Sequence, residues 1–232
     1  IMPSLVGSEM CIRDSKCTDP SLGCTLQIAP VPPPPTTSPE FWTAAADGSR
    51  VLYSVGGDLF EFDVDKALAG EPARTLIAGK ADAGVGGGVA AASEDASRIY
   101  FVSREEIDGE GEDGGRNLYL YEPDRSGPER YRLVATLRAQ STLVDQSLIV
   151  AGPTPISNGV RVTADCAHLA FVSTSSPSGY DNADATDGRP NLEIYLYDSD
   201  AEEVRCISCN PSGARPRGLS LIHISEPTRL GM

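Results

Sequence analysis

The feature that most constrains this chain is a two-part pattern that occurs three times. The first part is an Asp-containing turn followed by a short apolar segment, and its copies align without gaps at residues 47–53, 95–101 and 165–171. The second part alternates aromatic and aliphatic residues and ends in an acid, at residues 58–63, 117–122 and 193–198. Alternation with a period of two predicts β-strands. A repeated β-unit is therefore predicted.

Two further segments flank each copy. A segment of small residues precedes it (41–45, 88–92 and 160–164), and a fourth apolar segment follows it (74–78, 131–137 and 203–207). Four antiparallel strands in each unit are typical of a β-propeller blade. We therefore predict an all-β fold: a partial β-propeller of about three four-stranded antiparallel blades, preceded by one strand of an earlier blade at residues 24–28.

This pattern divides the chain into consecutive segments. We expect the outer strand of a preceding blade and a proline-rich linker at 16–40, the first blade at 41–79 and the second at 86–139. A connection at 140–158, the third blade at 159–209 and a linker to a missing blade at 210–218 follow. Residues 1–15 and 219–232 are expected to be foreign to the protein.

The two ends are predicted to derive from one piece of DNA. Residues 219–229 (LSLIHISEPTR) can be encoded by a widely used sequencing adapter, and residues 4–15 (SLVGSEMCIRDS) can be encoded by its reverse complement. Segments of this kind are excluded from an argument about fold. Cys11 and His223 therefore drop out as candidate functional residues.

The turn aspartates Asp47, Asp95 and Asp165 are predicted to be structural. An aspartate side chain can accept a hydrogen bond from the backbone two residues further on and so stabilise a tight turn. This structural role is favoured over a catalytic one.

The distance between the two parts of the pattern grows from the first copy to the third, because residues are inserted at 104–116 and 174–191. Insertions on one face of a repeat scaffold are where such proteins usually bind their partners. These two acidic segments are the predicted binding face.

An acidic cluster in the second insertion offers oxygen ligands. Asp181, Asp184 and Asp187 precede Gly188, but their spacing differs from that of a calcium loop. A solvated acidic loop is the main interpretation and a calcium site the alternative. No other cofactor is expected.

The remaining cysteines are Cys17, Cys24, Cys166, Cys206 and Cys209, which favours an oxidising compartment. Cys206 and Cys209 form a C-x-x-C motif that suits a redox pair, half a zinc site or a local disulfide. No helix is predicted there to lower a thiol pKa, and zinc needs a second close pair. A structural disulfide or two buried thiols is favoured. A second disulfide between Cys17 and Cys24 is a further candidate.

Charge and composition exclude several partners. The net charge is −14, and an acidic surface repels nucleic acid and anionic headgroups. No run approaches the ~20 apolar residues of a membrane-spanning helix. Solubility explains this charge better than steering of a cationic ligand does.

No catalytic constellation emerges. The G-x-S-x-G nucleophile motif is absent, and His168, the only histidine outside the terminal segments, lies within a repeat. The chain is therefore predicted not to be an enzyme.

Several segments resemble those of a known class, the WD40-like and TolB-like propeller repeats of exported bacterial proteins, particularly of actinobacteria. They are residues 164–171, 178–184 and 195–198, the last running into 206–213. The turn Asp165-Cys166-Ala167 departs from the Pro-Asp-Gly that is common in this class, and a looser turn is expected there. The resemblance implies an interaction platform in the cell envelope.

The predicted function is a non-enzymatic propeller scaffold that binds a protein or glycan through its inter-strand loops. Its expected location is the cell envelope or the extracellular space. The alternative is the non-catalytic propeller of a larger enzyme, such as a prolyl-oligopeptidase-like peptidase, whose catalytic domain lies outside this chain.

Overall fold

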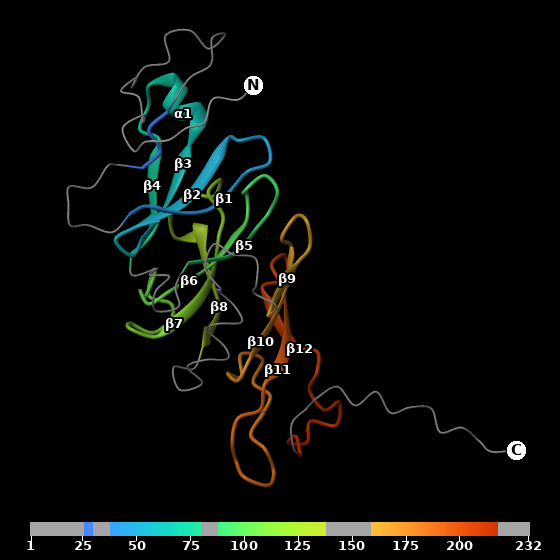
Figure 1. Cartoon of the computed structure of the whole chain (residues 1–232). Coiled ribbons are helices and arrows are strands. Elements are labelled where there is room, and N and C mark those ends of the chain that lie inside the picture. Colours follow the sequence, from blue (N-terminus) through green and yellow to red (C-terminus); the bar gives the residue numbers. More distant parts are fainter. Residues whose placement is uncertain (1–25, 30–37, 80–87, 138–158, 218–232) are drawn as a thin grey trace, which may run out of the picture.

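The computed structural model describes residues 26–29, 38–79, 88–137 and 159–217. These residues form three separate four-stranded antiparallel sheets that follow one another along the chain (Figure 1). In every sheet, strands adjacent in sequence are also neighbours in the sheet. Each sheet is therefore a simple up-and-down unit.

The first sheet, blade 1, contains a helix that the sequence pattern does not predict. Its strands are β1 (Glu40–Ala44), β2 (Arg50–Val55), β3 (Asp58–Asp63) and β4 (Arg74–Ala78). The helix α1 (Val64–Ala69) links β3 to β4. Asp63 caps its first turn by accepting the backbone N–H of Lys66 at 2.9 Å, and Gly70 ends it with a φ of 77°. The acid that closes the aromatic strand thus also starts a helix.

Blades 2 and 3 repeat this arrangement. Blade 2 contains β5 (Gly88–Ala92), β6 (Ile99–Ser103), β7 (Arg116–Tyr121) and β8 (Tyr131–Leu137), with a short 3-10 helix at Gly127–Arg130. Blade 3 contains β9 (Val160–Val162), β10 (His168–Ser173), β11 (Glu193–Asp198) and β12 (Glu203–Cys206). The first strand of each blade lies at the contacts between blades, since β5 of blade 2 contacts both β1 of blade 1 and β9 of blade 3. The prediction of an all-β, partial propeller fold is confirmed.

The strands of blade 2 contribute side chains to two apolar cores, one shared with blade 1 and one shared with blade 3. Phe101 and Tyr119 pack with Leu52 and Leu59 of blade 1. The adjacent Val102 and Leu118 face the other way and pack with Phe171 of blade 3. Because successive side chains of a strand point to opposite faces, a single aromatic-aliphatic strand contributes to both interfaces.

The Asp turns precede the second strand of each blade and have similar geometry. The Oδ1 atoms of Asp47, Asp95 and Asp165 each accept the backbone N–H two residues on, at 2.9, 3.0 and 3.0 Å. The residue after each aspartate has a positive φ: 77° at Gly48, 52° at Ala96 and 52° at Cys166. Cys166 thus adopts the same backbone conformation as Ala96.

Residues 26–29 form no strand, although a strand of an earlier blade is expected from residue 24 onward. Leu26 and Ile28 pack against an apolar cluster that contains Val51 and Tyr53. Arg74, on the outer strand β4, donates hydrogen bonds to the carbonyl oxygens of Ile28 at 2.9 Å and Gln27 at 3.4 Å. Side-chain contacts with blade 1, rather than a β-ladder, hold this segment.

Candidate functional site

The two insertions occupy equivalent places in their blades. The first insertion (residues 104–116) joins β6 to β7, and the second insertion (residues 174–191) joins β10 to β11. Each therefore leaves its sheet between the second and third strands, at the same end of the blade. This is the predicted binding face.

The first insertion folds around Tyr119 and Asn117 of β7. The Tyr119 hydroxyl contacts the carbonyl oxygen of Glu110 at 2.6 Å, and the Asn117 amide donates to that of Glu112 at 3.0 Å. Gly111 is confined here, because a Cβ at this residue would lie 2.3 Å from the Tyr119 oxygen. Buried side chains of the sheet therefore fix the shape of an otherwise exposed loop.

Asn182 has the corresponding role in the second insertion. It is 3% exposed, and its Nδ2 donates to the carbonyl oxygens of Thr174 and Asn191, both at 2.9 Å. These contacts join the two ends of the insertion. Asn182 lies between Asp181 and Asp184 in the sequence and is the internal brace of the loop.

Each of the three aspartates of the second insertion accepts a hydrogen bond from a backbone N–H of its own loop. Asp184 is buried and accepts the N–H of Thr186 at 2.6 Å, and Asp187 accepts the N–H of Arg189 at 2.9 Å. Asp181 lies exposed. Within the described ranges, these three carboxylates do not gather within 4.8 Å of one another. Calcium binding remains a prediction.

Residues 210–217 lie along the second insertion. Tyr180 donates its hydroxyl to the carbonyl oxygen of Ala214 at 2.7 Å, and Arg215 forms an ion pair with Asp181 at 2.6 Å. The backbone N–H of Ala185 also donates to the carbonyl of Pro216 at 2.9 Å. Residues 210–217, predicted from the sequence to be a linker, therefore lie against the predicted binding face.

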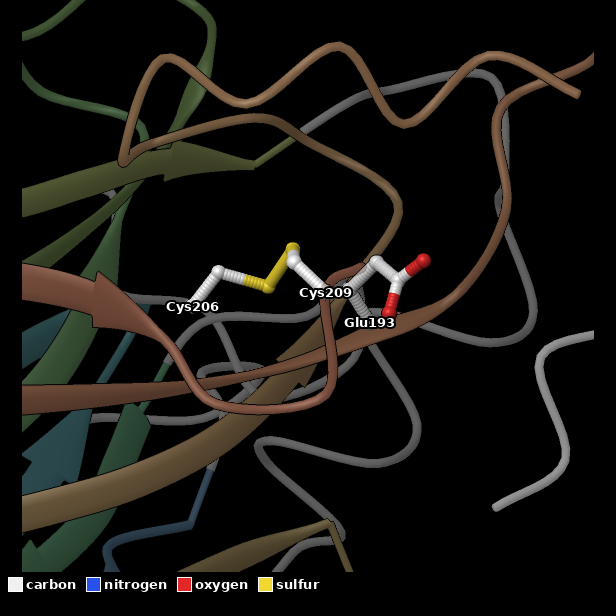
Figure 2. A group of neighbouring side chains, drawn as sticks. All are labelled: Glu193, Cys206 and Cys209. Atoms are coloured by element: carbon white, nitrogen blue, oxygen red, sulfur yellow. A yellow bond between two sulfur atoms is a disulfide. The ribbon is translucent and has the colours of Figure 1, made fainter. Parts of the chain in front are cut away.

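Cys206 and Cys209 are joined by a disulfide at the end of β12 (Figure 2). Beside them, the buried Glu193 accepts a hydrogen bond from Ser208 through Oε2. Glu193 and the two sulfur atoms form the only group of three potential metal ligands found in the described part of the chain. Both sulfur atoms are used in the disulfide, so the group as it stands offers no thiolate pair. Cys17 and Cys24 lie outside the described residues.

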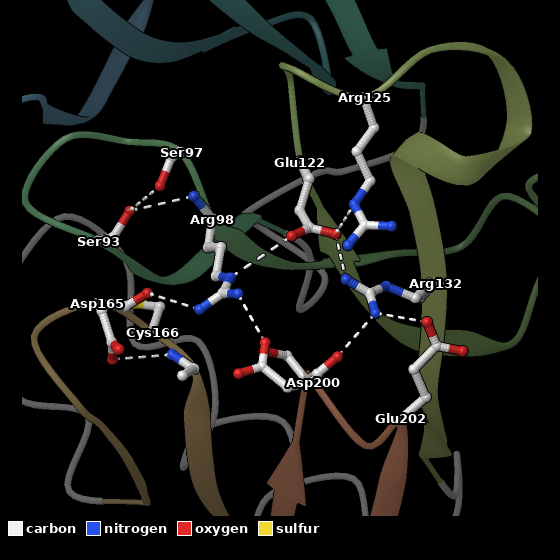
Figure 3. A network of polar contacts seen from close by, with 12 residues as sticks. Ser93, Ser97, Arg98, Glu122, Arg125, Arg132, Asp165, Cys166, Asp200 and Glu202 are labelled. Carbon is white, nitrogen blue, oxygen red and sulfur yellow. Dashed lines mark hydrogen bonds and ion pairs between the residues drawn. The ribbon is translucent and has the colours of Figure 1, made fainter.

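A polar network that the sequence pattern does not indicate joins blades 2 and 3 (Figure 3). The carboxylate of Glu122, on blade 2, forms ion pairs with Arg98, Arg125 and Arg132. Arg98 continues to Asp200 of blade 3 at 2.8 Å, and Arg132 to Glu202 at 2.6 Å. One buried acid thereby orients arginines that bind the next blade.

The contact between blades 1 and 2 repeats part of this network. Arg50 forms an ion pair with Glu61 of its own blade at 3.5 Å and with Asp124 of blade 2 at 2.5 Å. Arg50 and Arg98 each stand three residues after a turn aspartate. In blade 3 the equivalent residue is His168, which lies 3.6 Å from Asp198 of the same blade. The turn motif therefore also positions the residue that joins two blades.

No helix in the described residues is long and apolar enough to cross a membrane.

Neither a protein-family model nor a curated protein matches the chain. Solved structures do. The β-propeller domain of the Trilobed protease from Pyrococcus furiosus matches at 12% identity and a TM-score of 0.38, over 72% of this chain and 40% of that one. TolB from Acinetobacter baumannii matches at 13% identity and a TM-score of 0.33, over 73% of this chain and 30% of that one. Dipeptidyl peptidase 4 from Porphyromonas gingivalis matches at 13% identity and a TM-score of 0.39, over 86% of this chain and 27% of that one.

The chain thus spans less than half the length of these three proteins. The fold is a partial β-propeller. This conclusion rests on the three sheets, their shared strand order and the cores between them.

Proposed function

We propose that this chain is a non-enzymatic propeller scaffold that presents its two insertions to a protein or glycan partner, in the cell envelope or outside the cell. The observation that carries the proposal is the internal bracing of both insertions by buried residues, Tyr119 and Asn117 in one and Asn182 in the other. A loop that is already ordered loses less conformational entropy on binding.

The charge on the first insertion supports a basic protein segment as the partner. Glu106, Asp108 and Glu112 are exposed there, at the surface of the loop. Complementary charge speeds encounter and favours one partner over another. An acidic partner would be repelled by the same surface.

A defined probe tests this proposal. A fluorescent lysine-rich peptide is titrated with the chain and with the triple variant Glu106→Gln, Asp108→Asn, Glu112→Gln, at low and at physiological salt. The control variant Asp65→Asn, Glu71→Gln, Glu129→Gln removes the same charge from exposed positions elsewhere. We expect binding about fivefold weaker in the insertion variant and little change in the control.

An equal loss in both variants would show attraction to net charge alone and would reject the binding face. An uncharged oligosaccharide mixture forms the second arm of the experiment. Binding of these sugars that is unaffected by salt and by the charge variants would assign a glycan partner instead.

The alternative, a propeller belonging to a larger enzyme, is tested by the extended reading frame of the parent gene. A following α/β segment with G-x-S-x-G and later Asp and His would replace the scaffold proposal. The genomic sequence around that reading frame also tests whether residues 1–15 and 219–232 are derived from an adapter. The same sequence tests our proposal that the protein comes from an actinobacterium.

Calcium binding at the second insertion is a separate part of the proposal. Calorimetric titration of the chain with calcium, beside the variant Asp184→Ala, tests it. Absence of heat in both would remove calcium from the proposed function.

A further inference from the structure

Two arginines of blade 2 stand apart from the rest of this acidic protein. Arg104 directly follows β6, and Arg116 begins β7. In the described residues, Arg50, Arg98 and Arg132 each have carboxylate partners. By contrast, no ion pair joins Arg104 or Arg116 to a carboxylate in the described residues, and the Nε atoms of both and the Nη1 atom of Arg116 are buried and have no hydrogen-bond partner. The Nε atom of Arg132 is also buried without a partner, but both of its Nη atoms are paired.

Arg104 and Arg116 lie at adjacent strand ends, one directly after β6 and the other at the start of β7. Burial and the positive charge of Arg104 both lower the pKa of Arg116 from its ordinary value. Arg116 is 9% exposed. Burying a charge without a partner costs free energy, and placing a like charge beside it adds to that cost. Only a group of opposite charge offsets both.

The pair also lies at a defined place. Ser103 and Asn117 are the last register partners of β6 and β7, so Arg104 and Arg116 flank this pair at the mouth of the first insertion. Arg116 shares its face of β7 with Leu118 and Leu120, which pack against blade 3. The arginines are therefore at the rim of the interface between blades 2 and 3, beside the predicted binding face.

We propose that Arg104 and Arg116 form a binding site for a small oxyanion, such as a phosphate, a sulfate or a carboxylate group. Guanidinium groups bind such groups through charge-assisted hydrogen bonds. Three buried donors without partners give the oxyanion its contacts. The site is independent of the proposed function, because it requires no partner protein.

One internal competitor is Glu193, which begins β11 and alternates with Tyr195 and Tyr197 on the face packed against blade 2. Its Oε1 atom is buried and has no hydrogen-bond partner, and no ion pair joins it to Arg116 within the described residues. If the two paired in solution, the site would be filled by the protein itself. The experiment must therefore separate an external oxyanion from this carboxylate.

The test measures the thermal midpoint of the full chain in sodium phosphate, sodium sulfate and sodium acetate, against sodium chloride at the same ionic strength and pH 7. Isothermal titration then gives the dissociation constant of whichever anion raises the midpoint. Phosphate or sulfate alone would assign a tetrahedral oxyanion, and acetate alone would assign a carboxylate.

The variants are Arg116→Met and Arg104→Gln, with Arg189→Gln as a matched control, since Arg189 is an exposed arginine of the other insertion. We expect each site variant to weaken anion binding by about tenfold or more and the control to leave it unchanged. Without anion, Arg116→Met should keep or raise the thermal midpoint, because a buried unpaired charge is removed.

Three results would overturn the proposal. The first is equal midpoints in all four salts. The second is anion stabilisation that survives in Arg116→Met. The third is a non-additive loss of stability in Arg116→Met and Glu193→Gln, which would show that these two residues pair with each other.

Discussion

The guanidinium of Arg98 in blade 2 contacts the carboxylate of Asp200 in blade 3, with 2.8 Å between Nη2 and Oδ1. Arg50 makes the equivalent contact from blade 1 to Asp124 in blade 2. In both cases the arginine follows the turn aspartate by three residues, and the acceptor lies just beyond the aromatic strand of the next blade. The repeat therefore specifies how blades join as well as how each one folds.

Replacing Arg98 should weaken the contact between blades 2 and 3. Arg98→Met keeps the apolar stem but removes the ion pairs to Glu122 and Asp200. We expect the free energy of unfolding to fall by about 1–2 kcal/mol. The loss is limited to this size because Glu122 keeps its ion pairs with Arg125 and Arg132. Urea denaturation measures this difference. Arg205→Met removes an arginine from an exposed pair with Glu203, and an equal loss in that control would contradict a special role for Arg98.

The sequence predicts the strands of each blade well because alternation and the turn aspartates are local signals. It does not predict the contacts between blades. Arg50 and Asp124 are 74 residues apart, whereas Arg98 and Asp200 are 102 apart, because the insertions and the connections between blades both differ in length. No constant spacing marks these pairs, and only the three-dimensional stacking of blades shows them.

The candidate site was predictable in part for a related reason. Unequal spacing located both insertions, but their bracing by Asn117, Tyr119 and Asn182 depends on side-chain direction. The pair Arg104 and Arg116 carried one available signal, since both flank an insertion next to a strand end. That both lack partners in an acidic protein required atomic positions.

Asp95 should contribute stability that depends on pH. Hydrogen bonds from Ser93 and Ser97 lower its pKa from 3.8 to about 2. A carboxyl with a lower pKa in the folded state stabilises the fold above its unfolded pKa and loses that effect as the pH falls through the folded value. We expect Asp95→Asn to lower stability at pH 6 and to match the unchanged chain near pH 2.

Chemical denaturation at several pH values measures this effect. Glu71→Gln, at an exposed loop position, serves as the control and should show no such trend. A constant difference between Asp95→Asn and the unchanged chain from pH 6 to pH 2 would indicate that the charge of Asp95 is not involved.

Gly88 should tolerate no side chain. A Cβ there would lie 2.3 Å from two ring carbons of Trp42, and the φ of 121° disfavours any L-residue. We expect Gly88→Ala to lower the free energy of unfolding by about 2–4 kcal/mol. Gly48→Ala is the matched control, because its φ is 77° but nothing lies within 4 Å of the added carbon, and it should cost about 1 kcal/mol.

Tryptophan fluorescence reports on the same substitution, since Trp42 is the only tryptophan of the chain and contacts both inter-blade cores. The emission of Gly88→Ala should shift while that of Gly48→Ala should not. Unchanged emission and stability in Gly88→Ala would show that β1 and β5 are further apart than described.

The disulfide between Cys206 and Cys209 should stabilise the end of blade 3 by a modest amount. The two residues are separated by 3 positions, so the cross-link closes a short loop and removes little entropy from the unfolded chain. We expect Cys206→Ser, Cys209→Ser to lose about 2 kcal/mol at most. Dithiothreitol should bring the unchanged chain to the same value, and stability that does not respond to reductant would show that the disulfide is absent in solution.

Cys166 should remain unreactive toward alkylating reagents while the chain is folded. Its side chain is buried, and burial raises the pKa of its thiol to about 12, so the reactive thiolate is scarce at pH 8. Peptide mapping by mass spectrometry after treatment with iodoacetamide measures alkylation at this residue. We expect modification of Cys166 to follow global unfolding in urea.

The variant Tyr100→Phe removes the hydroxyl that is bonded to the Cys166 carbonyl at 2.9 Å. This variant should speed the alkylation of Cys166 by loosening the contact between blades 2 and 3. Fast alkylation in the native chain would mean that this interface opens without unfolding.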